Sequence, residues 1–131
     1  RAKMYLTFDF QDKRPLYQQV VDGIKELIAR GALKEGMRLP PVRQVAGDLG
    51  VNLNTIAVAY RQLHEEGLIA VRHGAAAVVK ARRTEVVGQD ELRRGLRAVL
   101  TQLVLAGLGK REIVTMVRDE LAAVGGKGGA R

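Results

Sequence analysis

Three segments in the first half of the chain show apolar residues at helical spacing. They cover residues 15–31, 41–50 and 52–67, and each ends at a glycine. Apolar residues that recur every three or four positions share one helical face, and a following glycine is a common helix stop. The pattern predicts three helices, the first with Pro15 at its first helical position. The apolar positions are Leu16, Val20, Ile24, Leu27, Ile28, Val42, Val45, Ala46, Leu49, Ile56, Ala59, Tyr60 and Leu63.

The second and third of these helices are joined by a short connection around Gly50. Asn52 is expected to cap the third helix, because its short polar side chain can accept a hydrogen bond from a free backbone N–H group. Two helices joined so closely through a glycine are typical of a helix-turn-helix, which presents its second helix to the major groove of DNA. The sequence therefore predicts a helix-turn-helix.

Two short segments that contain valine follow the third helix. Residues 68–72 and 77–81 lie on either side of His73 and Gly74, which predicts a small hairpin with its turn at these two residues. A hairpin directly behind a helix-turn-helix is a wing. Beside the first helix, Lys13 and Arg14 are expected to be solvated, as are Glu65 and Glu66 at the end of the third.

The second half of the chain shows a different organisation. Two more apolar stripes at helical spacing flank Gly107 and Gly109, which predicts a helical hairpin. Helices of about 15 residues need tertiary partners, so we expect these faces to pack on a second copy rather than on the chain's own first helix. The predicted dimerisation residues are Leu92, Leu96, Val99, Leu103, Ile113, Val117 and Leu121.

These patterns together predict a mainly α fold with a small β-hairpin. A winged helix-turn-helix domain is expected over residues 1–83 and a helical dimerisation region over 84–124. Residues 125–131 contain four glycines and two cations, which predicts a flexible Gly-rich tail.

The charge of the chain indicates what kind of partner the protein binds. Its 131 residues include 22 Lys and Arg against 14 Asp and Glu, a formal net charge of +8 with a pI near 10.3. Such a surplus is expected of a protein that binds a polyanion. Nucleic acid is the first candidate and an anionic membrane surface the second. Most of the surplus lies in residues 1–83.

Candidate catalytic chemistry is absent from the sequence. The chain has no cysteine, which removes disulfides, thiolate nucleophiles and cysteine-based zinc sites and permits the cytoplasm as the expected location. His64 and His73 are its two histidines, and neither has the spacing of a metal site or a catalytic triad. We therefore expect no enzyme activity, no metal and no cofactor.

Residues 15–79 resemble the winged helix-turn-helix domain of the GntR family of bacterial transcription regulators. The opening Pro-Leu-Tyr-Gln-Gln and the Asn-x-Asn-Thr at 52–55 resemble its YtrA subfamily, which has a short two-helix C-terminal region. Aminotransferase-like members need a far longer C-terminal domain, so pyridoxal phosphate is excluded by length. The other matching positions are Gly36-Met37-Arg38-Leu39-Pro40, Arg43, Ala46, Leu49-Gly50-Val51, Ala59-Tyr60, Leu63, Glu66-Gly67-Leu68-Ile69 and His73-Gly74.

The resemblance implies a set of DNA-binding residues. Arg43 matches an arginine that contacts DNA in the family, and His73 and Gly74 match a wing tip that enters the minor groove. Asn52 is expected to cap, whereas the next two polar residues of the helix are expected to reach base edges. The full predicted set is Arg43, Asn52, Asn54, Thr55, Arg61, His73 and Gly74.

Several positions depart from the family pattern. Pro41 stands where serine is frequent, which removes a side-chain cap from the second helix. Leu53 and Ala57 stand where many other subfamilies have arginines that recognise bases, so base recognition must depend on Asn54, Thr55 and Arg61. Ala75 to Ala77 replace a stretch that is closer to Gly-x-Gly-Thr in relatives, which predicts a weaker wing contact.

The sequence thus predicts a homodimeric, cytoplasmic repressor that binds a palindromic operator in double-stranded DNA. One alternative is a protein-interaction adaptor that keeps the winged fold without sequence-specific DNA binding. Another is an RNA or membrane-surface binder that uses only the basic charge. A small-molecule effector, if the protein has one, is expected between subunits or near Arg83, because the helical hairpin is too small to enclose the roughly 300 Å³ of a usual ligand pocket.

Overall fold

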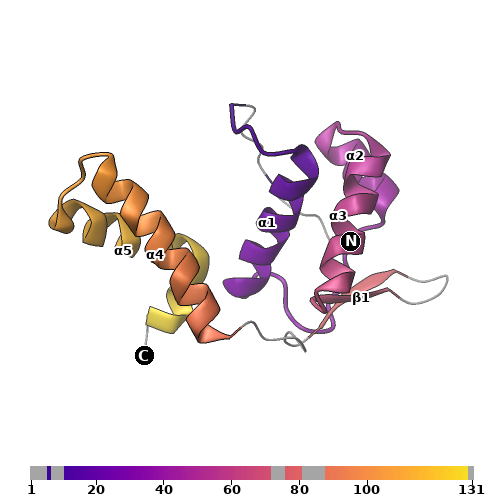
Figure 1. The fold of residues 1–131 in the computed structure, drawn as a ribbon. Helices are drawn as coiled ribbons and strands as arrows, with labels where there is room; N and C mark the ends of the chain where they lie inside the picture. Colours follow the sequence, from indigo (N-terminus) through magenta and orange to yellow (C-terminus); the bar gives the residue numbers. More distant parts are fainter. Residues whose placement is uncertain (1–5, 7–10, 72–75, 81–87, 130–131) are drawn as a thin grey trace. The chain divides into compact units, whose positions relative to one another are not determined.

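The computed structural model describes residues 6, 11–71, 76–80 and 88–129, with the side chains of 125–129 left out. Residues 1–85 and 86–131 form two compact units, which we call the N-terminal and C-terminal units. The elements of both are drawn in Figure 1. In chain order they are α1 (Leu16–Ala29), α2 (Val42–Leu49), α3 (Leu53–Glu65), β1 (Ile69–Val71), β2 (Ala77–Val79), α4 (Gln89–Leu105) and α5 (Lys110–Gly129).

Helix α1 begins directly after Pro15 and ends just before Gly31. Pro15 is the N-cap residue rather than the first helical residue, so its predicted place was one position too far into the helix. Gly31 has a φ of 84°, and its N–H donates to the carbonyl of Ile28 while that of Ala32 donates to Leu27. A left-handed residue that closes the last turn in this way suits glycine, which has no Cβ to clash.

The helix-turn-helix consists of α2 and α3 with Gly50, Val51 and Asn52 between them. Gly50 is left-handed and ends α2, and Asn52 caps α3 by accepting a hydrogen bond from the N–H of Asn54 at 2.7 Å. The predicted stop and the predicted cap are both confirmed. They turn the chain sharply between the two helices and fix where α3 begins.

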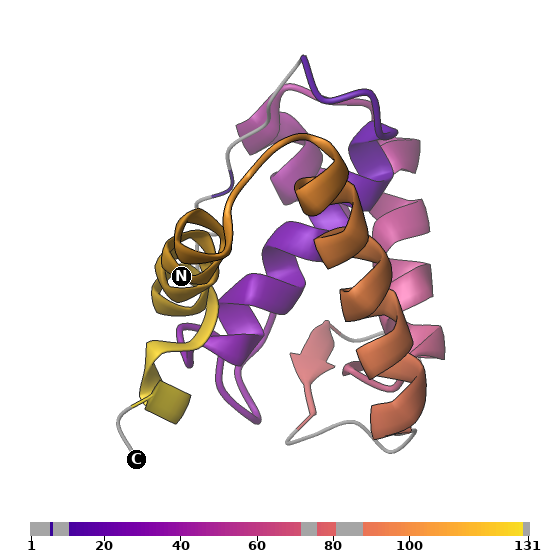
Figure 2. The same cartoon turned by 60° about the vertical axis from the view of Figure 1, so that its left-hand side comes forward.

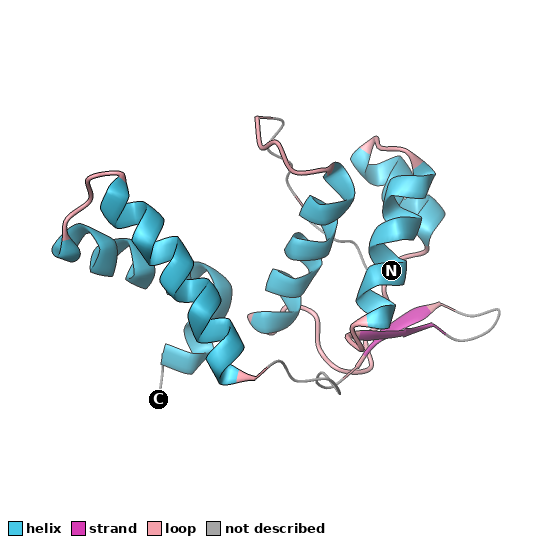
Figure 3. Cartoon of the chain, in the orientation of Figure 1, coloured by secondary structure: helices cyan, strands magenta, loops and turns pink. Residues whose placement is uncertain are grey.

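Strands β1 and β2 form an antiparallel hairpin, shown in magenta in Figure 3. Ile69 pairs with Val79 and Val71 with Ala77, so the strands are shorter than the predicted segments. An isolated bridge joins Arg38 to Val78 and ties the loop before α2 to the hairpin. The predicted wing tip, His73 and Gly74, lies outside the described residues, as do Ala75 and Arg83.

The core of the N-terminal unit lies around α3, which packs against both α1 and α2. Its apolar side chains come from all three helices, the loop between α1 and α2, and the hairpin. Burial on this scale is the main favourable contribution to folding. The buried members are Val20, Val21, Ile24, Leu27, Leu33, Leu39, Val45, Ala46, Ile56, Ala59, Tyr60, Leu63, Leu68, Ile69, Ala77 and Val79.

The C-terminal unit is the helical hairpin of α4 and α5, as predicted. Gly107, with a φ of 97°, forms the turn between them, and the Glu112 carboxylate accepts a hydrogen bond from the N–H of Gly109 at 2.7 Å. Figure 2 shows this turn, which joins the end of α4 to the start of α5. Helix α5 continues to Gly129, so the helix end that the apolar pattern places at Val124 is too early.

Candidate nucleic-acid interface

Helix α3 has a buried side and an exposed side. Ile56, Ala59 and Leu63 are fully buried, whereas Asn54 and Arg61 are exposed. Asn54 and Arg61 are seven residues apart, or about two helical turns, so their side chains lie on the same side of the helix. An amide and a guanidinium on one exposed helical face match the donor and acceptor pattern of base edges in the major groove.

The start of α3 is set by Asn52, which was predicted as both a cap and a DNA contact. Its side-chain oxygen is used by the Asn54 N–H, which establishes the capping role. Thr55 is half-buried, and its N–H donates to the Asn52 carbonyl at 3.0 Å. The two polar residues predicted to reach bases therefore differ, because Asn54 is exposed and Thr55 is only partly so.

Arg43 lies in the first turn of α2 and is exposed. Pro41 is the N-cap of this helix and provides no side-chain cap, as the departure from serine predicted. Within the described parts of the chain, neither Arg43 nor Arg61 takes part in an ion pair. Both guanidinium groups thus keep their donors for an external anion such as a phosphate.

An open groove of about 660 Å³ lies between the start of α2, the second half of α3 and the hairpin. Its lining is mainly apolar, with Arg61 and His64 as the two side chains that can bear positive charge. The His64 Nδ1 atom lies 3.3 Å from the Ile69 carbonyl oxygen, which holds the ring against the first strand. The groove is lined by Pro40, Pro41, Val42, Ala57, Tyr60, Arg61, His64, Val71, Ala76 and Ala77.

Tyr60 connects the helix-turn-helix to the loop that precedes it. Its hydroxyl donates to the Pro40 carbonyl at 2.6 Å, and burial raises its pKa well above the ordinary value. A buried carbonyl that lost this donor would be left without a partner in a region that excludes water. The hydrogen bond therefore holds the start of α2, and Arg43 with it, against α3.

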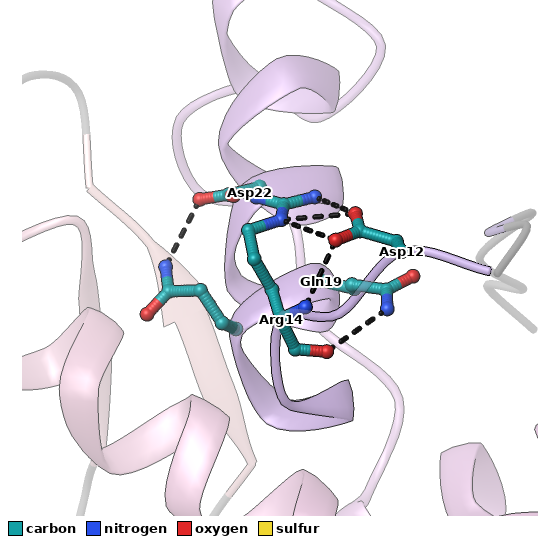
Figure 4. A network of polar contacts seen from close by, with 5 residues as sticks. Asp12, Arg14, Gln19 and Asp22 are labelled. Atoms are coloured by element: carbon teal, nitrogen blue, oxygen red, sulfur yellow. Dashed lines mark hydrogen bonds and ion pairs between the residues drawn. The ribbon is translucent and has the colours of Figure 1, made fainter. Parts of the chain in front are cut away.

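Arg14, expected to be solvated, is exposed and is also bound by two carboxylates (Figure 4). Its Nε and Nη2 atoms donate to Asp12 Oδ2 at 2.9 and 2.7 Å, and Nη1 pairs with Asp22. The Gln19 side chain donates to the Arg14 carbonyl at 3.3 Å. The hydrogen bonds from Arg14 hold the pKa of Asp12 below its ordinary value. Arg14 thus fixes the entry of α1 and is not a free cation.

Glu66 was also expected to be a solvated residue, and it stays partly exposed while it bridges two other side chains. Its Oε1 atom lies 2.7 Å from Lys25 Nζ on α1, and its Oε2 atom accepts a hydrogen bond from Gln62 at 3.0 Å. These contacts join the end of α3 to α1. Together with the Arg14 cluster they pair two of the cations at α1 with carboxylates of the same chain.

The C-terminal unit offers a second candidate surface, which is apolar. Leu92, Leu96 and Val99 on α4 have exposed fractions of 56%, 54% and 55%, and all three lie on one helical face. Val117 and Leu121 on α5 are exposed as well. Leu103 is half-buried. Ile113 is buried within the single chain, so it is less accessible to a partner than the other predicted dimerisation residues.

Metal sites and membrane-spanning helices are the other features considered for the described residues. No group of three or more His, Cys, Asp or Glu is placed to hold a metal ion within these parts of the chain. Across the same ranges, no helix is both long and apolar enough to cross a membrane.

One family model matches a segment of the N-terminal unit, and a relative matches most of the chain. A model of the gntR family of bacterial regulatory proteins matches residues 16–79. The transcriptional repressor YtrA of Bacillus subtilis is 29% identical over 93% of this chain and 97% of its own length.

Two solved structures are similar over both units. YtrA from Sulfolobus acidocaldarius, a GntR-family transcription factor, is 36% identical, with a TM-score of 0.55 over 91% of this chain and 98% of that one. A transcriptional antiterminator from Listeria monocytogenes is 26% identical, with a TM-score of 0.84 over 95% of this chain and 96% of that one.

Proposed function

The chain belongs to the GntR family of bacterial regulatory proteins, with its helix-turn-helix in the matched segment, and from this premise we propose that it is a homodimeric repressor of transcription that binds a palindromic operator. In this proposal α3 enters the major groove, and Arg43 contacts DNA beside it. The wing reaches the adjacent minor groove, and the protein acts in the cytoplasm. Repression follows from occupancy of the operator.

The observation that carries the proposal is the exposed face of α3. Asn54 and Arg61 stand on that face, directly behind a sharp turn fixed by Gly50 and the Asn52 cap. Arg43 adds a second guanidinium on α2, and neither arginine is used in an ion pair among the residues that the structure describes. Such an arrangement supports recognition of bases by α3 and of the sugar-phosphate backbone around it.

The groove beside α3 supports a path for the DNA backbone. It is lined by both α3 and the hairpin, and under the proposal these two elements contact neighbouring grooves of one duplex. The strand between those grooves must pass the space between the elements. Arg61 and His64 at the groove can meet its phosphates, and the apolar lining suits its sugars.

The apolar face of the C-terminal unit supports the homodimer. Helices α4 and α5 leave Leu92, Leu96, Val99, Val117 and Leu121 exposed, an unusual state for aliphatic side chains that lie in stripes. A symmetric partner would cover the same patch on both copies. Two copies of α3 about 34–36 Å apart would face successive major grooves on one side of B-DNA, which a symmetric dimer on a palindromic site requires.

The proposal is tested by selection of duplexes from a random-sequence pool by the purified protein at physiological salt. The mass in solution is measured on the same preparation. We expect an enriched inverted repeat and a dimeric mass. Enrichment of no sequence, with binding that only weakens as salt rises, would instead support a protein that uses its charge without recognising bases.

A further inference from the structure

The exposed face of α3 contains an aliphatic side chain that its own fold does not bury. Leu53 is the first residue of the helix and has an exposed fraction of 42%, whereas Ile56 and Leu63 of the same helix are completely buried. Leu53 is not part of the core cluster, and a large part of its side chain is in contact with water. It is available to whatever contacts the start of the helix.

Leu53 has a small apolar neighbour one turn further along. Ala57 follows it by four residues, so the two side chains lie on the same side of α3, and Ala57 is half-buried at the edge of the groove. Asn54 precedes and Arg61 follows Ala57 on the adjacent exposed strip. The face that would meet base edges therefore combines two apolar side chains with one amide and one guanidinium.

Base edges in the major groove differ in how they tolerate apolar neighbours. Guanine, cytosine and adenine present hydrogen-bonding groups there, and thymine presents a methyl group beside its carbonyl oxygen. An aliphatic side chain against a hydrogen-bonding group displaces water without replacing its hydrogen bonds, which is unfavourable. Against the thymine methyl group the same side chain buries apolar surface, which is favourable.

We propose that Leu53 and Ala57 select thymine in each half-site by contact with its C5-methyl group, while Asn54 pairs with a neighbouring adenine. This inference rests on the proposed function, because it requires α3 in the major groove. Asparagine suits adenine since its amide can donate to N7 and accept from the N6 amino group. The half-site next to the start of α3 is therefore rich in A·T pairs.

The test uses the duplex that the protein selects from a random pool. Each thymine in its half-site is replaced in turn by deoxyuridine, which removes only the methyl group, and the Kd is measured for each duplex. We expect at least one position where uracil weakens binding about fourfold per half-site, the value of one buried methyl group. Equal Kd values for thymine and uracil at every position would overturn the inference.

Two leucine variants assign the effect to Leu53. In Leu53→Ala the preference for thymine over uracil at that position should fall clearly below fourfold, and only the share that Ala57 contributes should remain. Leu105→Ala removes an equally large side chain, 81% exposed, from the C-terminal unit and should keep the full preference. A preference that survives unchanged in Leu53→Ala would exclude Leu53 as its source.

The same data separate this inference from the proposed function. Enrichment of no duplex would overturn both. An enriched duplex whose half-sites lack thymine, or one that accepts uracil everywhere, would overturn the methyl contact and leave the DNA-binding function standing. Because Leu53 is exposed and alanine favours helix, the variant is expected to fold, and its circular dichroism spectrum checks this.

Discussion

The two units of the chain differ in how they use apolar side chains. The N-terminal unit buries sixteen of them in one core, with Val20, Val21, Ile24, Ile56, Ala59 and Leu63 at 0% exposure. In the described part of the C-terminal unit Ile113 alone is buried, and the aliphatic stripe of α4 is more than half exposed. The N-terminal unit thus has a hydrophobic core of its own, as an independent domain needs. The C-terminal unit has an exposed apolar face that a partner would cover.

This difference separates two roles within a short chain. A domain that is already packed can use its surface for polar recognition, and Asn54, Arg43 and Arg61 are exposed on α2 and α3. A hairpin without a core of its own gains stability from assembly. The two roles can therefore be disturbed separately by substitution.

The largest expected effect is on the core of the N-terminal unit. Ile24→Ala removes a completely buried side chain and should lower the free energy of unfolding by about 2–5 kcal/mol, measured by urea denaturation. Leu105→Ala in the C-terminal unit should change it by less than about 0.5 kcal/mol, since that side chain is mostly exposed. Equal losses in the two variants would contradict the contrast between the units.

The next effect concerns assembly. Leu96→Glu places a charge in the middle of the apolar stripe and should weaken dimerisation by on the order of 3 kcal/mol, about a hundredfold in Kd. Sedimentation over a range of concentrations would measure this. The N-terminal unit should remain folded, so a variant that unfolds as a whole would show that the units are not separable.

An effect on DNA without an effect on assembly is expected at Arg43. Arg43→Ala should weaken operator binding by about 1–3 kcal/mol if the guanidinium recognises a base, or lower the salt slope by about one if it contacts a phosphate. Arg94→Ala removes the same charge from α4 and provides the matched control. If both variants lose affinity equally at every salt concentration, Arg43 has no specific role.

Tyr60→Phe should cost about 1–2 kcal/mol of stability, because it removes the donor to the buried Pro40 carbonyl. The same residue predicts a pH effect. The pKa of Tyr60 is raised in the folded state. Its contribution to the free energy of unfolding is therefore complete below the pKa of about 10 in the unfolded state, and it decreases as the pH rises above that pKa. The loss of unfolding free energy at high pH should be smaller in Tyr60→Phe than in the unchanged protein.

The smallest effect is expected at the cap of α3. Asn52→Ala removes the acceptor for the Asn54 N–H and should lower stability by about 1 kcal/mol, whereas Asn52→Asp should retain most of it. Thermal unfolding of the two variants measures the difference. A loss of the same size in Asn52→Asp would show that the side chain acts through something other than capping.

Features set by neighbours in sequence could be predicted from the sequence. Gly31, Gly50 and Gly67 all have positive φ where the pattern placed a helix stop, and Asn52 caps as expected. The C-terminal end of α5 is one such feature that was predicted wrongly. The glycines after Val124 suggested the end of a helix that continues to Gly129.

Features that depend on contacts between distant segments could not be predicted. Arg14 meets Asp22 across two turns of α1, and Glu66 reaches Lys25 from the end of α3. The Tyr60 hydrogen bond to Pro40 and the groove beside it require the packed arrangement of α2, α3 and the hairpin. The polar residues of the candidate interface were predicted from the resemblance and from their spacing. Their exposure could be known only from the folded structure.

We propose that the N-terminal unit recognises DNA while the C-terminal unit joins two copies. The most direct test is the mass of the complex formed with the selected inverted repeat, compared with a duplex that contains one intact half-site. We expect two chains on the inverted repeat and much weaker binding to the single half-site. One chain per duplex, with equal affinity for both, would contradict it.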